Sequence, residues 1–382
     1  MDTTSPPTFN DPPPPPPPPL TPPPVLAPGP PPRPSRRGRG WMIFAFVLLV
    51  LLGLSVLMNL GHLLESMFSI KGVGARVAGP RLDEVVLEDN DASSKFVVVP
   101  VEGIITSQVI DRGGFNLVDI IKAQLKRADK DDKVKAVILK VDSPGGEVLA
   151  SDEISRALEE FQDKSGKPVI VSMGSLAASG GYYISAPSRW IVANELTITG
   201  SIGVIMHGFN YRGLMNKVGV RPEVYKSGKF KDMLSGSREP EEVTPEERQM
   251  LQALIDQTYA KFKDVVGEGR KQAHEKNEKD GKALARDWTD YADGRVLSGR
   301  EAQQLGFVDE LGNFDVAVQR AKKIAKVRGG ANLIEYRQRY DLSDFLGMFG
   351  ESQSRVLKVD VGIELPKLQA GRLYFLSPTY LH

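Results

Sequence analysis

The sequence predicts an α/β domain built from βαβ units around a mainly parallel sheet, preceded by one transmembrane helix. Three observations lead to this prediction. Short apolar runs alternate with amphipathic segments over residues 96–230, one uncharged apolar run of twenty residues lies near the start, and glycine-rich turns follow two of the apolar runs. Parallel strands are buried on both faces and therefore show continuous apolar runs, whereas crossover helices show apolar residues three or four positions apart.

The strands expected from the apolar runs are FVVVPVEGII, VKAVILKV, PVIVSMG and RWIVANE. Between them, residues 117–125 and 154–161 have apolar residues at helical spacing, which predicts crossover helices. Thr244, Pro245 and Glu247 form a capping box with proline at the first helical position, so a long helix is expected to begin there. These elements predict one large domain after residue 94.

Composition divides the chain into five segments. Proline dominates the start, including the unbroken run Pro12–Pro19, which favours an extended polyproline II conformation. This tail is either a ligand for a proline-binding partner or a low-complexity segment without one, and its composition favours the second. The expected segments are a disordered cytoplasmic tail (1–40), a transmembrane helix (41–62), a linker (63–94), the main domain (95–335) and a C-terminal extension (336–382).

The run from Trp41 to Leu60 contains no charged residue. At about 1.5 Å per residue, twenty residues span about 30 Å, the thickness of the bilayer core. The run is longer than the apolar part of a cleaved signal peptide, so an uncleaved anchor is expected. Four arginines within residues 33–39 place the amino terminus in the cytoplasm, and the main domain then lies outside it. The prediction is a single-pass protein of the cell (inner) membrane.

Composition also argues against several classes of function. The 49 Lys and Arg nearly balance the 48 Asp and Glu, so no overall charge favours nucleic-acid binding. The chain has no cysteine, which excludes disulfides and cysteine nucleophiles. The four histidines show none of the close pairing that is typical of zinc sites, and no metal or other cofactor is expected.

Two glycine-rich turns are the places where chemistry is expected, because ligands of open α/β sheets bind beyond the carboxyl ends of strands. DSPGGEV follows one predicted strand and SLAASGGYYIS follows another, and neither matches a phosphate loop or a dinucleotide fingerprint. In the second turn, Ser179 stands where a loop enters a helix, and nearby backbone amides can stabilise an oxyanion. Gly146 of the first turn could offer a second amide. Both turns are equally compatible with tight structural connections.

A serine nucleophile needs a base, and no G-x-S-x-G elbow supports a Ser-His-Asp triad. A lysine can take this role when burial beside the serine favours its neutral form. Lys226, Lys229 and Lys231 lie close together in YKSGKFKDMLS, and the pattern does not choose among them. Each is also compatible with a solvated surface position.

The ordered set of motifs resembles the signal peptide peptidase A family of Ser/Lys proteases, in its short form with a single catalytic repeat. The matching segments cover roughly residues 96–325 and are DSPGGEV, SMGSLAASGGYYIS, TGSIGVI, KSGKFKD, TPEER and GRVLSGREAQQLGFVDELGNFD. The resemblance implies a Clp-protease/crotonase-like fold and serine endopeptidase activity.

Carried over motif by motif, the resemblance implies roles for five residues. Ser179 of AASGG would be the nucleophile and Lys231 of KSGKFKD the base. Ser201 of TGSIG would be an accessory serine that orients the lysine amine, and the amides of Gly146 and Gly180 would form the oxyanion hole. The family pattern is intact at all five positions.

The resemblance also implies partners and substrates. Short forms of the family assemble into rings, so the resemblance implies a homo-oligomer such as an octamer. The serine and the lysine of one site would then come from one subunit or from neighbouring subunits. Substrates would be cleaved signal peptides and other apolar peptides. The alternatives are a related membrane protease that cleaves one integral membrane partner, a crotonase-type acyl-CoA enzyme, and a non-enzymatic membrane scaffold.

Overall fold

The computed structural model describes residues 42–56, 79–109, 115–278, 280–339 and 373–376. The chain divides into two units, residues 1–76 and residues 77–382. In the first unit, residues 42–56 are helical and their side chains are mostly exposed. This helix covers part of the predicted transmembrane segment, and residues 41 and 57–62 lie outside the described residues. Within the described ranges, no helix has both the length and the apolar character that crossing a bilayer requires.

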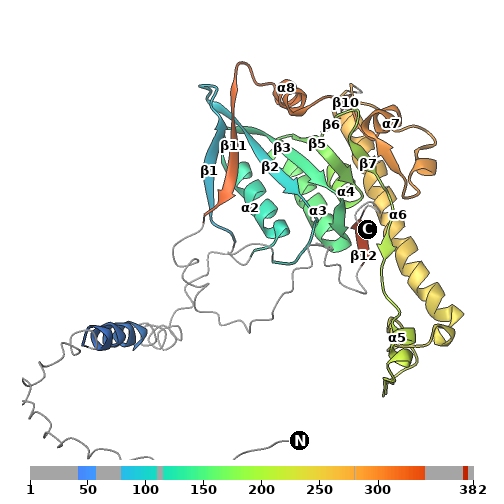
Figure 1. Ribbon diagram of the computed structural model, residues 1–382. Helices are drawn as coiled ribbons and strands as arrows, with labels where there is room; N and C mark the ends of the chain where they lie inside the picture. Colours follow the sequence, from blue (N-terminus) through green and yellow to red (C-terminus); the bar gives the residue numbers. More distant parts are fainter. Residues whose placement is uncertain (1–41, 57–78, 110–114, 279, 340–372, 377–382) are drawn as a thin grey trace, which may run out of the picture. The chain divides into compact units, whose positions relative to one another are not determined.

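The second unit is built on a nine-stranded, mainly parallel sheet with a small three-stranded sheet beside it (Figure 1). Its strands are β1 (Leu82–Glu88), β2 (Ser94–Glu102), β3 (Val134–Ser143), β4 (Gly145–Glu147), β5 (Val169–Ala178), β6 (Trp190–Ala193), β7 (Ile198–Gly200), β8 (Ile205–Met206), β9 (Val296–Ser298), β10 (Glu310–Leu311), β11 (Ala331–Gln338) and β12 (Leu373–Leu376).

The main sheet has the order β1-β11-β2-β3-β5-β6-β10, and β7 pairs with the end of β5 and with β9. β2, β3, β5 and β6 are parallel neighbours, and they are the four strands predicted from the apolar runs. The predicted α/β fold with a mainly parallel sheet is therefore confirmed. Antiparallel pairing occurs where β1 joins β11 and where β9 joins β7.

Helices cover both faces of the main sheet (Figure 1). The α-helices of this unit are α2 (Leu117–Lys130), α3 (Val148–Ser165), α4 (Gly180–Ser185), α5 (Arg212–Lys217), α6 (Pro245–Lys276), α7 (Gly299–Gln304) and α8 (Phe314–Ile324). The larger buried cluster joins one face of the sheet to α2, α3, α4 and α6, and the smaller cluster joins the other face to α8. Burying apolar side chains on both faces fixes the sheet and hence the turns at its carboxyl edge.

The long helix α6 begins as the sequence predicts. The Thr244 side chain accepts a hydrogen bond from the Glu247 amide, Glu247 bonds back to the Thr244 amide, and Pro245 occupies the first helical position. Midway along the helix, Phe262 is fully buried in the larger cluster, whereas residues near the helix start are mostly exposed. One part of α6 therefore belongs to the core and its beginning extends beyond it.

Two predicted boundaries differ from the structure. β1 lies inside the expected linker 63–94, because its alternating sequence LDEVVLE pairs antiparallel with β11 at the edge of the sheet. β11 continues to Gln338 and so crosses the expected start of the C-terminal extension at residue 336. Within that extension, β12 adds to the three-stranded sheet, in the order β4-β12-β8. The segment therefore contributes to the folded unit.

Two glycines in α6 are expected to respond in opposite ways to alanine. A Cβ at Gly269 would lie 2.7 Å from the Ala186 carbonyl oxygen, whereas a Cβ at Gly267 would make ordinary contact with Trp288 at 3.5 Å. Gly269→Ala should lower the free energy of unfolding by about 1–3 kcal/mol because backbone must move. Gly267→Ala, the matched control, should raise it by roughly 0.5–1 kcal/mol through helix propensity. Urea unfolding measures both, and equal effects would contradict the close packing of α6 on α4.

Candidate active site

Ser179 lies at the junction between β5 and α4. Its backbone has φ 54° and ψ −116°, a region that residues with a Cβ rarely adopt, and its amide donates a hydrogen bond of 2.8 Å to the Gly200 carbonyl. The side chain is 1% exposed, and its Oγ is buried without a hydrogen-bond partner among the residues that the structure describes. A strained backbone that holds an unpartnered hydroxyl is typical of functional sites.

The two glycine-rich turns contact one another directly beside Ser179. A Cβ at Gly180 would lie 3.0 Å from the Gly146 amide nitrogen and 2.7 Å from Ser151 Oγ. A Cβ at Gly145 would lie 2.5 Å from the Gly180 nitrogen. Only residues without side chains allow this approach, and it brings the amides of Gly146 and Gly180 close together. Two amides brought together in this way can donate to one oxyanion.

Hydrogen bonds to Ile105 fix the direction in which the Gly146 amide points. The Ile105 amide donates to the Gly145 carbonyl at 2.9 Å, and the Glu147 amide donates to the Ile105 carbonyl at 2.8 Å. Backbone groups of successive residues in a strand point to opposite edges. The amide and carbonyl of Gly146 therefore face the other edge, where β12 lies.

Ser201 follows β7 and is also close to this turn. Its φ is 50°, its side chain is buried, and its amide donates to the Arg295 carbonyl at 2.7 Å. Ser201 lines a cavity of about 550 Å³ together with Tyr259 and Leu376. The Ser179 amide donates to the carbonyl of Gly200, the residue directly before Ser201. This hydrogen bond holds the two serine-bearing turns beside each other. The structure thus brings Ser179, Ser201, Gly146 and Gly180 into one region.

Lys231 does not belong to that region within this chain. It lies in the segment of residues 207–243, which we call the arm, and its side chain is exposed. Lys229, two positions earlier, pairs with Glu246 in the first turn of α6. Glu246 and Phe262 are sixteen residues apart, which corresponds to about 24 Å along a helix. In Figure 1 the arm, with α5, lies at the end of α6 that is farther from the sheet. The desolvation expected of a lysine base is absent here.

Comparisons with known proteins agree with the sequence motifs. The family model described as "Peptidase family S49" matches residues 161–328. A candidate signal peptide peptidase SppA of Enterococcus faecium is 38% identical over 260 residues, which cover 67% of this chain and 71% of that protein. This chain belongs to the S49 family of peptidases. It is a serine endopeptidase of the signal peptide peptidase A type.

Two further relatives match over a smaller share of their own length than the Enterococcus protein does. The chloroplast serine protease SPPA of Arabidopsis thaliana is 32% identical over a match that covers 66% of this chain and 34% of the plant protein. Protease 4 of Salmonella typhi is 38% identical over a match that covers 55% of this chain and 31% of the bacterial protein. Among solved structures, a serine-to-alanine mutant of the 1510-N membrane-bound stomatin-specific protease is 19% identical, with a TM-score of 0.34 over 60% of this chain and 86% of that one.

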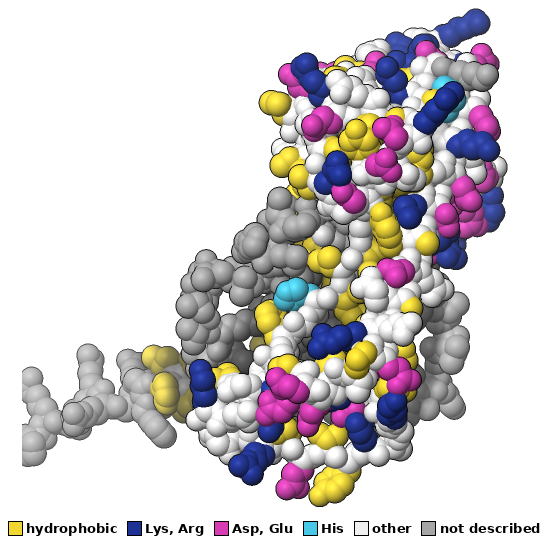
Figure 2. Space-filling model, turned by 90° about the vertical axis from the view of Figure 1, so that its right-hand side faces the viewer, with side chains coloured by type: hydrophobic (Ala, Val, Ile, Leu, Met, Phe, Trp, Pro, Cys, Tyr) yellow, Lys and Arg dark blue, Asp and Glu magenta, His cyan; other side chains and the backbone are white. Residues whose placement is uncertain are grey.

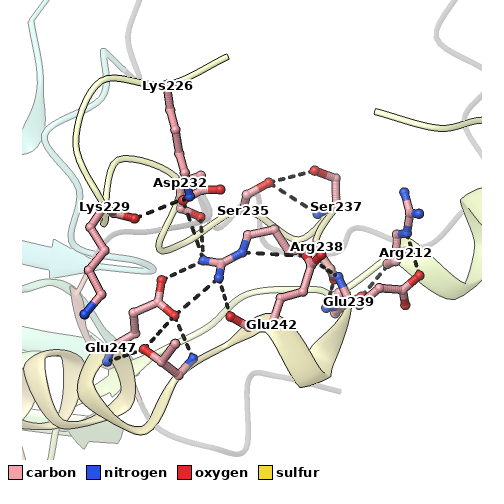
Figure 3. A network of polar contacts seen from close by, with 12 residues as sticks. Arg212, Lys226, Lys229, Asp232, Ser235, Ser237, Arg238, Glu239, Glu242 and Glu247 are labelled. Atoms are coloured by element: carbon pink, nitrogen blue, oxygen red, sulfur yellow. Dashed lines mark hydrogen bonds and ion pairs between the residues drawn. The ribbon is translucent and has the colours of Figure 1, made fainter. Parts of the chain in front are cut away.

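A polar network attaches the arm of this S49 peptidase to the start of α6 (Figure 3). Arg238 donates to Glu247 Oε1 at 2.6 Å, and Lys226 donates to Asp232 at 2.7 Å. The hydrogen bond from Arg238 lowers the pKa of Glu247 to about 2, and the hydrogen bond from Lys226 lowers the pKa of Asp232. Glu247 also caps α6, so one carboxylate ties the helix start to the arm that carries Lys231.

The position of β12 beside the site was not predicted from the sequence. β12 lies beside Gly146, and Phe375 in β12 is fully buried against Tyr183 and Phe262. A run of four apolar residues is too short to reveal its partners. Over the residues that the structure describes, no group of three or more His, Asp or Glu is placed to hold a metal ion.

The strain at Ser179 predicts a difference between two variants that both lack the hydroxyl. Ser179→Gly should be more stable than Ser179→Ala by about 1 kcal/mol, because glycine adopts positive φ without a steric cost. Ser175, an exposed residue in β5, is the control, since there the glycine variant should be the less stable one. Urea unfolding measures these differences, and equal stability at residue 179 would argue against backbone strain.

The low pKa of Glu247 predicts a stability loss in acid. A carboxylate whose pKa falls from 4.5 to about 2 on folding stabilises the folded protein above pH 4.5, and this contribution is lost as the pH falls toward 2. Glu247→Gln should flatten this part of the curve of thermal unfolding midpoint against pH. Glu246→Gln, one position earlier and exposed, is the control and should leave the curve unchanged. Identical curves for all three proteins would exclude this role.

Proposed function

We propose that this S49 peptidase is anchored in the cell (inner) membrane and hydrolyses cleaved signal peptides and other apolar peptides outside the cytoplasm. The main support for the proposed peptide hydrolysis is the unpartnered hydroxyl of Ser179, which a strained turn holds beside the Gly146 and Gly180 amides. The uncharged run Trp41–Leu60 and the arginines before it support the anchor and its orientation. The proline-rich tail would then be available to cytoplasmic partners.

The proposed chemistry uses the groups at the turn together with Lys231. Neutral Lys231 removes the proton of Ser179, whose Oγ attacks the peptide carbonyl, and the two glycine amides donate to the resulting oxyanion. The ammonium of Lys231 returns the proton to the leaving amine, and water then hydrolyses the acyl-enzyme. Ser201 would orient the lysine amine.

We further propose that Lys231 reaches Ser179 from a neighbouring copy of the chain. Within one chain, the side chain of Lys231 is exposed and the arm lies at the far end of α6. The arm also exposes large apolar side chains, among them Phe209 (76% exposed) and Tyr225 (93%). Figure 2 shows hydrophobic side chains scattered among charged ones on this face of the molecule. Contact with another copy would cover them and favour the neutral form of the lysine.

Complementation between two inactive variants tests the dyad and its origin. Ser179→Ala and Lys231→Ala should each lower the rate of peptide hydrolysis by about a thousandfold or more. When the two variants are co-expressed in equal amounts, about a quarter of the sites in a mixed ring combine an intact serine with an intact lysine. Activity should therefore return to about a quarter of the wild-type rate. No recovery would place both residues of a site in one chain.

Lys229→Ala is the matched control for the base. It removes an equivalent exposed lysine two positions away, one that pairs with Glu246, and should retain most of the activity. Full activity in Lys231→Ala would reject that residue as the base.

To identify the substrates, peptides that accumulate with the Ser179→Ala protein can be compared by mass spectrometry. Accumulation of a single membrane-protein fragment would favour a dedicated membrane partner over cleared signal peptides.

A further inference from the structure

A cavity of about 510 Å³, which we call the α8 cavity, lies where β6 ends beside β5. Its lining consists of Lys140 in β3, residues 172–175 in β5, residues 194 and 196–198 beyond β6, and residues 312–314 at the start of α8. Ligands of open α/β sheets bind in crevices of this kind, beyond the carboxyl ends of parallel strands. No residue with a proposed role in peptide hydrolysis lines the cavity.

The α8 cavity and the serine turn belong to opposite faces of the main sheet (Figure 1). Successive side chains of a strand point to opposite faces. Ile170 is buried in the smaller cluster against α8, so Ser172, two positions later in β5, points to the same face. α4, which begins directly after Ser179, packs in the larger cluster on the other face. The cavity is therefore separate from the candidate active site.

Ser172 places a buried hydroxyl at the wall of the cavity. Its side chain is 5% exposed, and its hydroxyl has no hydrogen-bond partner among the residues that the structure describes. Most buried polar side chains in folded proteins are hydrogen-bonded, because a hydroxyl that leaves water without a new partner is unfavourable. An oxygen atom of a ligand in the cavity would supply the partner.

Two features around Ser172 favour a negatively charged oxygen. Lys140 is directly opposite Ser172 in the register of β3 and β5, so its side chain lies on the same face of the sheet. α8, a helix of 11 residues, begins at the cavity, and the Asn313 side chain caps one of its first amides. The start of a helix has a partial positive charge and amides without partners inside the helix. An anion in the cavity would meet a hydroxyl, an ammonium group and a helix N-terminus.

Three carboxylates lie near the cavity, but none of them lines it. Glu102 is 3.7 Å from the Lys140 amine, and both side chains are at least half exposed, so their attraction is weak. Asp142 and Asp315 each accept a hydrogen bond from another residue of the protein. Among the described residues that line the cavity, Lys140 alone carries a charge.

Apolar side chains in the lining restrict the kind of anion. Leu196 is 79% exposed and Ile198 is 41% exposed. An inorganic anion would leave both side chains in water, whereas an organic anion with an apolar body would cover them. The reaction of an endopeptidase supplies such a molecule, because each cut releases a fragment with a new carboxylate next to its last side chain.

We infer that the α8 cavity binds the C-terminal carboxylate of peptides that end in an apolar residue, the products of this peptidase among them. The carboxylate accepts a hydrogen bond from the Ser172 hydroxyl and lies near Lys140 and the start of α8. The last side chain of the peptide covers Leu196 and Ile198. A fatty acid has the same two chemical groups, so the experiment separates these two sources. The cavity is independent of the proposed dyad, since it requires only that carboxylates of this kind are present.

Binding of a labelled peptide tests the cavity. Fluorescein-labelled Ala-Ala-Leu with a free carboxylate is titrated into the full-length Ser179→Ala protein and followed by anisotropy. The same peptide with a C-terminal amide should bind about tenfold more weakly, because it lacks the negative charge. Ser172→Ala and Lys140→Gln should each weaken binding of the carboxylate peptide by about tenfold, since each removes a donor to a charged group.

The chain offers a matched control for each variant. Ser188 is also buried with an unpartnered hydroxyl but lies outside the cavity lining, so Ser188→Ala should leave binding unchanged. Lys135, near the other end of β3, donates to the Asp132 carbonyl, and Lys135→Gln should also have no effect. Because the Lys140 side chain is half exposed, Lys140→Gln should fold and keeps the test decisive even if Ser172→Ala does not fold.

Three results would overturn the inference. The first is equal binding of the carboxylate and amide peptides, and the second is binding that responds to neither Ser172→Ala nor Lys140→Gln. The third is a rise of the thermal unfolding midpoint with hexanoate while the peptide does not bind, which would make a fatty acid the ligand. Acylation of Ser179 in the wild-type chain by a serine-directed probe tests the nucleophile alone, so the proposed function and the cavity can fail separately.

Discussion

The contact between the two glycine turns is the constraint on which the rest of the site depends. A Cβ on Gly145 would lie 2.5 Å from the Gly180 nitrogen, and a Cβ on Gly180 would lie 3.0 Å from the Gly146 nitrogen, so the two turns leave no space for side chains between them. This approach brings two amides together beside Ser179, whose backbone has a φ of 54°, a conformation that few residues tolerate. The parallel strands β3 and β5, which are neighbours in the sheet, deliver both turns to the same edge. The strain at Ser179 persists because the buried core on both sides holds these strands.

Much of this arrangement could be predicted from the sequence, since it depends on local patterns. The four central strands are continuous apolar runs, and the α6 capping box is a motif of four residues. Ser179 and the glycines stand in turns that directly follow predicted strands. The residues themselves left open whether the serine turn is catalytic and which of the three lysines of the arm is the base. The resemblance to the family decided between these alternatives.

The features that could not be predicted depend on distant partners. β1 and β12 are short strands whose pairing requires edges supplied by β11 in one case and by β4 and β8 in the other. Nothing in LYFL identifies these edges. The separation of Lys231 from Ser179 was also not evident, because it depends on how far α6 extends beyond the core. Motif order along a chain carries no information about such a distance.

The position of the arm at the far end of α6 has a consequence for when such an enzyme can act. A newly made copy has its serine turn, but its own Lys231 is exposed in the arm. With Lys231 as base, such a single copy could not cut the unfolded proteins around it. Activity would begin only where copies are dense enough to assemble. Local abundance of the protein would then act as the safeguard that other proteases obtain from an inhibitory propeptide.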